Sequence, residues 1–105
     1  MKNGGAVYII TNKNRTVLYI GVTNNIQRRM HEHKKGINKG FAQKYNCTDL
    51  LYYEVFWDIR DAIHREKQLK KWNREWKMEL IKKENPGLMD LSMDWFNEDG
   101  ELKEG

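Results

Sequence analysis

Side chains with acid, base or anion-binding chemistry fall in or beside apolar stripes on the inward faces of expected helices and strands. They are one glutamate, one arginine, one histidine and two tyrosines: Glu66, Arg29, His33, Tyr8 and Tyr19. A charged group on the inner face of a helix is costly to bury unless it is paired or has a function. Two interpretations follow: a catalytic or binding site, or a structural ion pair between Glu66 and Arg29.

The segment around Glu66 is predicted to be a helix that begins after a capping Asp58 and runs to about Lys71. Its apolar residues recur at steps of three and four, which places them on one face: Ile59, Ala62, Ile63 and Leu69. Glu66 lies within this face and is expected to point inward. Another helix is expected from about Arg74 to Glu84, with three residues inward: Trp76, Leu80 and Ile81.

The two tyrosines fall on runs rich in β-branched and aromatic residues, 6–11 and 17–22. A short polar turn joins the runs, so a hairpin is predicted, with Tyr8 within about one residue of facing Tyr19. Gly21 shares the face of Tyr19, and a glycine in a strand often marks close approach of a ligand or another backbone. A third strand is predicted at 50–56.

Arg29 and His33 are four residues apart in a helix predicted over 25–35, so they share a face beside Ile26 and Met30. Three other charged residues are expected to face water: Arg28, Glu32 and Lys35. His31 and His33 diverge on such a helix, which argues against a zinc-chelating pair. The element order predicts a small α/β (α+β) domain.

The composition favours a polyanionic partner. The net charge is +4, but residues 1–88 carry 18 Lys and Arg against 9 Asp and Glu, whereas residues 89–105 carry one Lys against six acids. A basic body of this kind attracts nucleic acid. Aromatic and basic residues alternate in one stretch: Trp72, Arg74, Trp76 and Lys77.

A cytoplasmic protein that does not associate with a membrane is expected. No apolar run approaches the roughly 20 residues of a membrane span, and the first residues lack the pattern of a signal peptide. Cys47 is the single cysteine, so an internal disulfide is excluded and a reducing compartment fits. Cys47 is interpreted as a small structural residue.

The ordered motifs resemble the GIY-YIG nuclease domain, and more narrowly the small stand-alone bacterial endonucleases of the UPF0213 or YhbQ-like group. The first triplet is Ala6-Val7-Tyr8 and the second is Tyr19-Ile20-Gly21. "NIQRRMHEH" resembles the helix with the family arginine, and "AIHREKQLKKW" resembles the helix with the family glutamate. Together with the trailer that ends in "NP", the resemblance covers roughly residues 5–91.

The resemblance implies a three-stranded antiparallel sheet flanked by helices and a metal-dependent endonuclease that hydrolyses phosphodiester bonds, with DNA as the expected substrate. Residues 1–88 would form the nuclease domain and 89–105 an acidic C-terminal tail. The implied catalytic residues are Tyr8, Tyr19, Arg29, His33 and Glu66. Glu66 would hold Mg²⁺ or Mn²⁺, and Arg29 would bind phosphate. Tyr8 or Tyr19 would be the base, with His33 as its helper.

Nucleic acid is expected to contact a larger, mostly basic set: Gly21, Arg28, Arg29, Lys70, Lys71, Arg74 and Lys77. The alternative function is a non-catalytic nucleic-acid-binding module that keeps the fold. Many family members carry an asparagine about twelve residues after the glutamate, and that place falls at Met78 here, with Asn73 and Asn85 nearby. For the tail, three roles stay open: a solvated end, a polyanion that occupies the substrate groove, or a protein-interaction segment.

Overall fold

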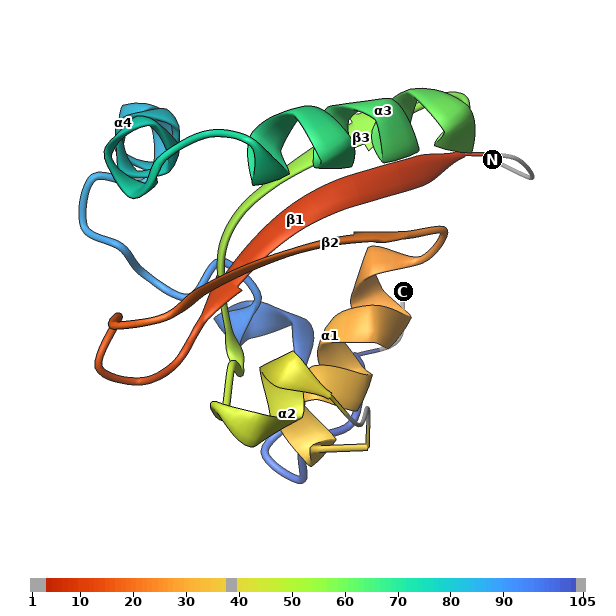
Figure 1. The fold of residues 1–105 in the computed structure, drawn as a ribbon. Helices are drawn as coiled ribbons and strands as arrows, with labels where there is room; N and C mark the ends of the chain where they lie inside the picture. Colours follow the sequence, from red (N-terminus) through yellow and green to blue (C-terminus); the bar gives the residue numbers. More distant parts are fainter. Residues whose placement is uncertain (1–3, 38–39, 104–105) are drawn as a thin grey trace.

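The computed structural model describes residues 4–37 and 40–103 as a three-stranded antiparallel sheet with helices on both faces (Figure 1). In chain order the elements are β1 (Gly5–Thr11), β2 (Leu18–Thr23), α1 (Ile26–Lys35), α2 (Phe41–Lys44), β3 (Asp49–Phe56), α3 (Ile59–Lys70), α4 (Arg74–Glu84) and the 3₁₀ helix η1 (Met93–Trp95). The predicted α+β class is confirmed, and the predicted strands and helices begin and end within one residue of those observed.

The sheet has the order β2-β1-β3, so β1 is central and buried along its whole length. Its residues alternate between two apolar cores because side chains along a strand point to opposite faces. Ala6, Tyr8 and Ile10 point to the α1 face of the sheet, where they pack with α1 and α2. Val7 and Ile9 point to the α3 face, where Leu69 of α3 and Ile81 of α4 cover them.

The register of the hairpin differs from the prediction for the two tyrosines. Tyr8 pairs with Gly21, and Tyr19 pairs with Ile10, so the tyrosines share a face but are offset by two residues. The loop between the strands sets this register. The Asn12 side chain accepts hydrogen bonds from the backbone N–H groups of Thr16 and Val17, and Arg15 adopts a left-handed φ of 56°.

Side-chain caps fix the ends of the helices that carry the candidate residues. Asn25 accepts a hydrogen bond from the backbone N–H of Arg28 at the start of α1, and Gly36 ends this helix with a left-handed φ of 69°. Asp58 caps α3 as predicted, by accepting from the backbone N–H of Arg60.

Two apolar residues predicted to be inward are exposed. Ile63 of α3 and Trp76 of α4 both present their side chains to solvent, whereas Ala62, Leu69 and Ile81 are buried as expected. Trp76 packs edge-on against Trp72 at the junction of the two helices, with ring centroids 6.2 Å apart. Helical periodicity identified the correct helices but predicted too wide a buried face.

The C-terminal segment is folded onto the body of the protein. Asp90 forms an ion pair with Lys34 at 2.6 Å and accepts a hydrogen bond from the backbone N–H of Leu50. Glu101 contacts Lys35 at 3.1 Å and His31 at 3.3 Å, both on α1. Asp90 and Glu101 therefore anchor this segment to α1 and the start of β3, which argues against a freely solvated end, one of the three roles left open for it.

Candidate active site

The side chain of Tyr8 crosses over the backbone of Gly21, and only a glycine at position 21 leaves room for it. The Tyr8 ring lies across Gly21 on the neighbouring strand, and a Cβ at position 21 would lie 2.4 Å from both Cζ and the hydroxyl oxygen of Tyr8. A glycine in β2 was expected to admit a ligand or a backbone, but here it admits the side chain of the paired strand. Tyr8 is fully buried as a result.

The buried phenol meets an imidazole. The Tyr8 hydroxyl lies 3.1 Å from Nε2 of His33, and the two rings meet edge-on with centroids 5.7 Å apart. The ring of Tyr19 lies 6.3 Å from the His33 ring. The structure thus brings together Tyr8, Tyr19 and His33 on the α1 face, from two strands and one helix.

The environment keeps both members of this pair neutral near pH 7. Burial, helped by the charge of Arg29, lowers the pKa of His33 to about 4. Burial raises the pKa of Tyr8 to about 12, although Arg29 opposes this by its charge and by hydrogen bonding. A neutral imidazole can accept a proton at Nε2, so the pair has the polarity of a phenol facing a proton acceptor.

Arg29 lies beside this pair and retains a free donor. Its Nε is 3.2 Å from Oε1 of Glu32, a contact whose geometry leaves the buried Nε without a hydrogen-bond acceptor among the described residues. Glu32 was expected to face water and is instead half-buried next to Arg29. A buried guanidinium donor without an acceptor can bind an anion such as phosphate.

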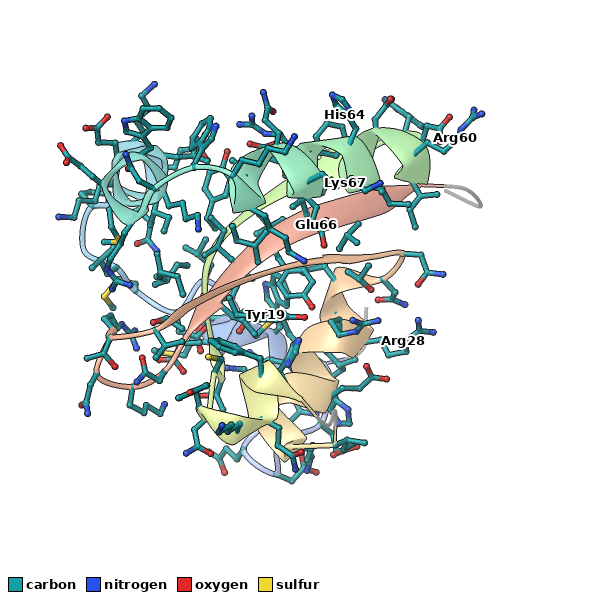
Figure 2. The ribbon with its side chains drawn as sticks, in the orientation of Figure 1. Tyr19, Arg28, Arg60, His64, Glu66 and Lys67 are labelled. Carbon is teal, nitrogen blue, oxygen red and sulfur yellow. The ribbon has the colours of Figure 1, made fainter. Side chains whose placement is uncertain are left out.

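Glu66 approaches from the other face of the sheet. It lies between α3 and β2 (Figure 2), its side chain is 14% exposed, and Lys70 contacts its Oε2 at 2.8 Å. Glu66 therefore pairs with Lys70 and Arg29 pairs with Glu32, so the structural ion pair between Glu66 and Arg29 does not form among the described residues.

A groove beside the edge strand β2 connects the two sets of residues. It has a volume of about 330 Å³ and is lined by Leu18, Tyr19, Ile20, Phe41, Lys70 and Lys77; we call it the β2 groove. Tyr19 links the groove to His33, and Lys70 links it to Glu66. Polar residues from opposite faces of the sheet thus meet at one edge.

The remaining basic residues of the expected nucleic-acid surface lie around this edge or have partners of their own. Lys77 lines the β2 groove, and Lys71 is exposed at the end of α3. Arg28 is exposed and donates to the Asn24 side chain, whereas Arg74 donates to the backbone carbonyl of Arg15.

Sequence reasoning missed Phe41, which lines the β2 groove from α2. The available signal was an aromatic pair, Phe41 and Tyr45, in a loop that is otherwise polar.

The residues at the groove fit a divalent metal only if other ligands complete its coordination. Across residues 4–37 and 40–103, no group of three or more His, Cys, Asp and Glu side chains is close enough to hold a metal ion. Mg²⁺ often binds through one or two carboxylates, together with water and substrate phosphates. The partly buried carboxylate of Glu66 fits this mode, with Lys70 as the cation that now balances its charge.

The asparagines near the place of the family asparagine have structural roles. Asn73 caps α4 by accepting from the backbone N–H of Trp76. Asn85 is buried and its side chain donates to the backbone carbonyls of Leu51 and Met89. Met78, at the expected place, packs against the core of the α3 face.

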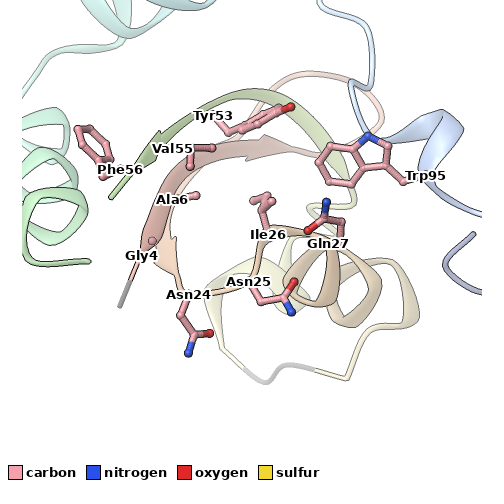
Figure 3. A pocket seen from close by; sticks show the side chains of 11 residues that line it. Gly4, Ala6, Asn24, Asn25, Ile26, Gln27, Tyr53, Val55, Phe56 and Trp95 are labelled. Carbon is pink, nitrogen blue, oxygen red and sulfur yellow. The ribbon is translucent and has the colours of Figure 1, made fainter. Parts of the chain in front are cut away.

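A larger hollow lies elsewhere, where β1 begins and α1 begins (Figure 3). Its volume is about 560 Å³, and Asn25, Tyr53 and Trp95 are among the residues around it. None of the five catalytic candidates is among the residues that line it, whereas Tyr19 lines the β2 groove.

Comparison with known proteins shows the family of this chain. The model of the GIY-YIG catalytic domain matches residues 4–79. The chain belongs to the GIY-YIG family. This is a family of nucleases that act on nucleic acid and generally depend on a divalent metal.

The names of the relatives of this GIY-YIG protein state no activity or substrate. It is 36% identical over 75 residues to a UPF0213 protein of Clostridium perfringens, which covers 71% of this chain and 80% of that protein. It is 34% identical over 84 residues to a UPF0213 protein of Syntrophus aciditrophicus, which covers 79% and 94%.

A solved structure shares the fold. The solution NMR structure of a UPF0213 protein from Bacillus halodurans matches with a TM-score of 0.54 and 21% identity, over 86% of this chain and 96% of that one. Within the described residues, no helix is long and apolar enough to cross a membrane.

Proposed function

We propose that this GIY-YIG protein is a metal-dependent endonuclease that hydrolyses phosphodiester bonds at the β2 groove, with DNA as its substrate. The observation that carries the proposal is the buried contact of Tyr8 with His33 beside the free donor of Arg29. A purely structural core gains little from a phenol, an imidazole and a guanidinium in the same place, because each must be desolvated.

The two tyrosines have different exposure and therefore different proposed roles. Tyr19 is partly exposed and lines the groove, so its phenol meets water or phosphate directly. Tyr8 is fully buried and contacts Nε2 of His33, so it holds the imidazole in place. In this proposal the phenolate of Tyr19 takes a proton from the attacking water as the water oxygen bonds to phosphorus and the bond to the leaving oxygen breaks. The His33 ring, 6.3 Å from the Tyr19 ring, helps to position that phenol.

Arg29 and Glu66 handle charge from opposite sides of β2. The guanidinium of Arg29 donates to phosphate oxygens and neutralises the charge that builds up during hydrolysis. Glu66 would hold a Mg²⁺ or Mn²⁺ ion, which when bound polarises the phosphate and stabilises the leaving oxygen. Lys70 contacts Oε2 of this carboxylate, and the phosphates of the substrate offer the Lys70 ammonium a further partner.

The test is a cleavage panel of DNA and RNA substrates, double-stranded, branched and single-stranded, with Mg²⁺ or Mn²⁺. The wild type is compared with Glu66→Gln, and with Glu79→Gln as a matched control at an exposed acid of α4. We expect Glu66→Gln to abolish cleavage while folding and nucleic-acid binding persist, and Glu79→Gln to cleave normally.

Three outcomes would count against the proposal. Full activity of Glu66→Gln would remove its role as a metal ligand. Unfolding of Glu66→Gln would show that the Glu66 carboxylate stabilises the fold. A wild type that binds nucleic acid but cleaves none of the panel would favour the non-catalytic binding module.

A further inference from the structure

An exposed aromatic cluster lies beside the candidate catalytic residues. Phe41 is 49% exposed, and its ring stacks on that of Tyr19 with centroids 5.9 Å apart and 22° between the planes. Its other neighbour is Tyr45, 40% exposed, at a centroid distance of 4.6 Å. Large apolar rings gain stability when buried, so two on one short surface helix and its cap are unexplained by packing of the core.

The cluster has a cationic border. Lys70 and Lys77 line the β2 groove together with Phe41, although they come from α3 and α4 on the other face of the sheet. The ammonium of Lys44 lies 5.5 Å from the centre of the Tyr45 ring. Flat aromatic rings bordered by lysines match the two parts of a nucleic-acid strand, since rings stack on bases and ammonium groups attract phosphates.

Such a platform discriminates between paired and unpaired bases. In a continuous duplex both faces of each base are covered by its neighbours, so a protein ring can stack only on a base that has left the stack. The backbone of a duplex can still be attracted by Lys70 and Lys77, but it would leave the rings of Phe41 and Tyr45 without a partner.

We propose that Phe41 and Tyr45 form a stacking platform for an unpaired nucleobase next to the bond that is cut, while Lys70 and Lys77 hold the neighbouring phosphates. The platform thus selects single-stranded or locally unpaired nucleic acid. This inference rests on the proposed function, because the platform adjoins Tyr19 and Lys70 adjoins Glu66.

Binding without cleavage tests the platform. Affinities for a DNA single strand and for a duplex of the same sequence are measured with EDTA present, using wild type, Phe41→Leu and Phe41→Trp. The matched control is Trp57→Leu, because Trp57 is 75% exposed and follows β3, at the edge of the sheet opposite β2.

We expect Phe41→Leu to weaken single-strand binding by about 10-fold, because loss of one base–ring stack has an effect of this order. Phe41→Trp should retain binding, Trp57→Leu should not change it, and duplex binding should change by less than about 2-fold. Unchanged single-strand affinity in Phe41→Leu, or an equal loss for single strand and duplex, would overturn the proposal. Retention in Phe41→Trp separates stacking from damage to α2.

A photochemical experiment locates the base. Single strands that carry 5-iodouracil at successive positions are irradiated on the wild-type protein in EDTA, and the crosslinked peptides are identified by mass spectrometry. We expect crosslinks at Phe41 or Tyr45; crosslinks confined to Trp57 or Trp76, which are also exposed, would overturn the proposal. Neither experiment needs cleavage, so a platform can be confirmed in an inactive protein and refuted in an active one.

Discussion

The α1 face and the α3 face of the sheet receive alternate residues of the same central strand, yet they bury different chemistry. The α1 face encloses Tyr8 and His33, with Arg29 at its margin. The core of the α3 face is mostly aliphatic, and Glu66 stays at its edge rather than inside it.

Two buried tyrosines make the contrast specific. On the α3 face the hydroxyl of Tyr52 donates to the carboxylate of Glu54, which Arg65 holds at 3.0 Å. Burial and this carboxylate both raise the pKa of Tyr52, so the phenol is locked as a donor. The hydroxyl of Tyr8 instead meets a neutral imidazole next to a cation that favours its ionised form. One phenol is fixed by a carboxylate and an arginine in a structural network, and the other faces an imidazole beside the candidate phosphate-binding arginine.

The largest expected effect is at Arg29. Arg29→Lys keeps the charge but loses the planar, paired donors that match phosphate, so cleavage should fall by about 100-fold or more. Arg60→Lys is the matched control, since Arg60 is exposed on α3 and lies outside the expected nucleic-acid surface. Single-turnover cleavage rates measure both. A near wild-type rate for Arg29→Lys would show that only the positive charge of Arg29 matters and that its paired donors do not.

The contrast between the two faces predicts that a substitution on the α3 face mainly lowers stability, whereas one on the α1 face mainly lowers cleavage. Leu69→Ala on the α3 face should lower the free energy of unfolding by about 2–5 kcal/mol while the folded fraction still cleaves. Tyr8→Phe should cost about 1 kcal/mol, the value of one hydrogen bond, but should greatly reduce cleavage. Urea unfolding and cleavage assays on both variants decide this. Normal cleavage by Tyr8→Phe would show that the Tyr8 hydroxyl has no role in catalysis and that the α1 face serves only to stabilise the fold.

Acid should destabilise the α1 face through His33. The pKa of His33 is about 4 in the folded protein and near 6.5 when unfolded, so only the unfolded chain takes up the proton as the pH falls between these values. Stability that is present above pH 6.5 is therefore lost toward pH 4, by roughly 3 kcal/mol from this residue.

The measurement is the difference in unfolding free energy between wild type and His33→Gln from pH 7 to pH 4, which cancels the titration of shared carboxylates. The wild type should lose its advantage as the pH falls. The exposed His64 provides the control variant His64→Gln, which should follow the wild type. Parallel curves for wild type and His33→Gln would contradict the burial of a neutral imidazole.

The smallest expected effect is at the crossing of Tyr8 over Gly21. Gly21→Ala places a methyl group 2.4 Å from the phenol, so the ring must move, at a cost of about 1–3 kcal/mol and with loss of its contact to His33. Gly87→Ala is the control, because the nearest atom to its added Cβ is the flexible Met89 side chain at 3.5 Å. Thermal unfolding compares the two. Equal stability of both variants would show that Tyr8 has room to shift.

Local patterns predicted most of the fold and identified the five candidate residues from their spacing. They could not predict how side chains meet across elements. The crossing of Tyr8 over Gly21 depends on a strand register that the Asn12 loop sets. The pairing of Arg29 with Glu32 is different, because it lies within α1 and follows from their spacing of three residues, a local signal that the sequence analysis did not use.

The groove itself was not predictable for a similar reason. Periodicity assigns a residue to one face of its own element, whereas the β2 groove combines Tyr19 from the α1 face with Lys70 and Lys77 from the α3 face at an open edge. Phe41 joins them from a helix of four residues, too short for any periodic signal.

The central claim is that residues from the two faces form one metal-dependent site at β2. Paramagnetic broadening by Mn²⁺ in NMR spectra of this protein, with an uncleavable DNA analogue bound, tests it most directly. Broadening should be strongest at Glu66 and at Tyr19–Gly21, should reach His33, and should disappear in Glu66→Gln. Broadening that survives in Glu66→Gln, or that centres on the acidic residues 90–101, would contradict the account.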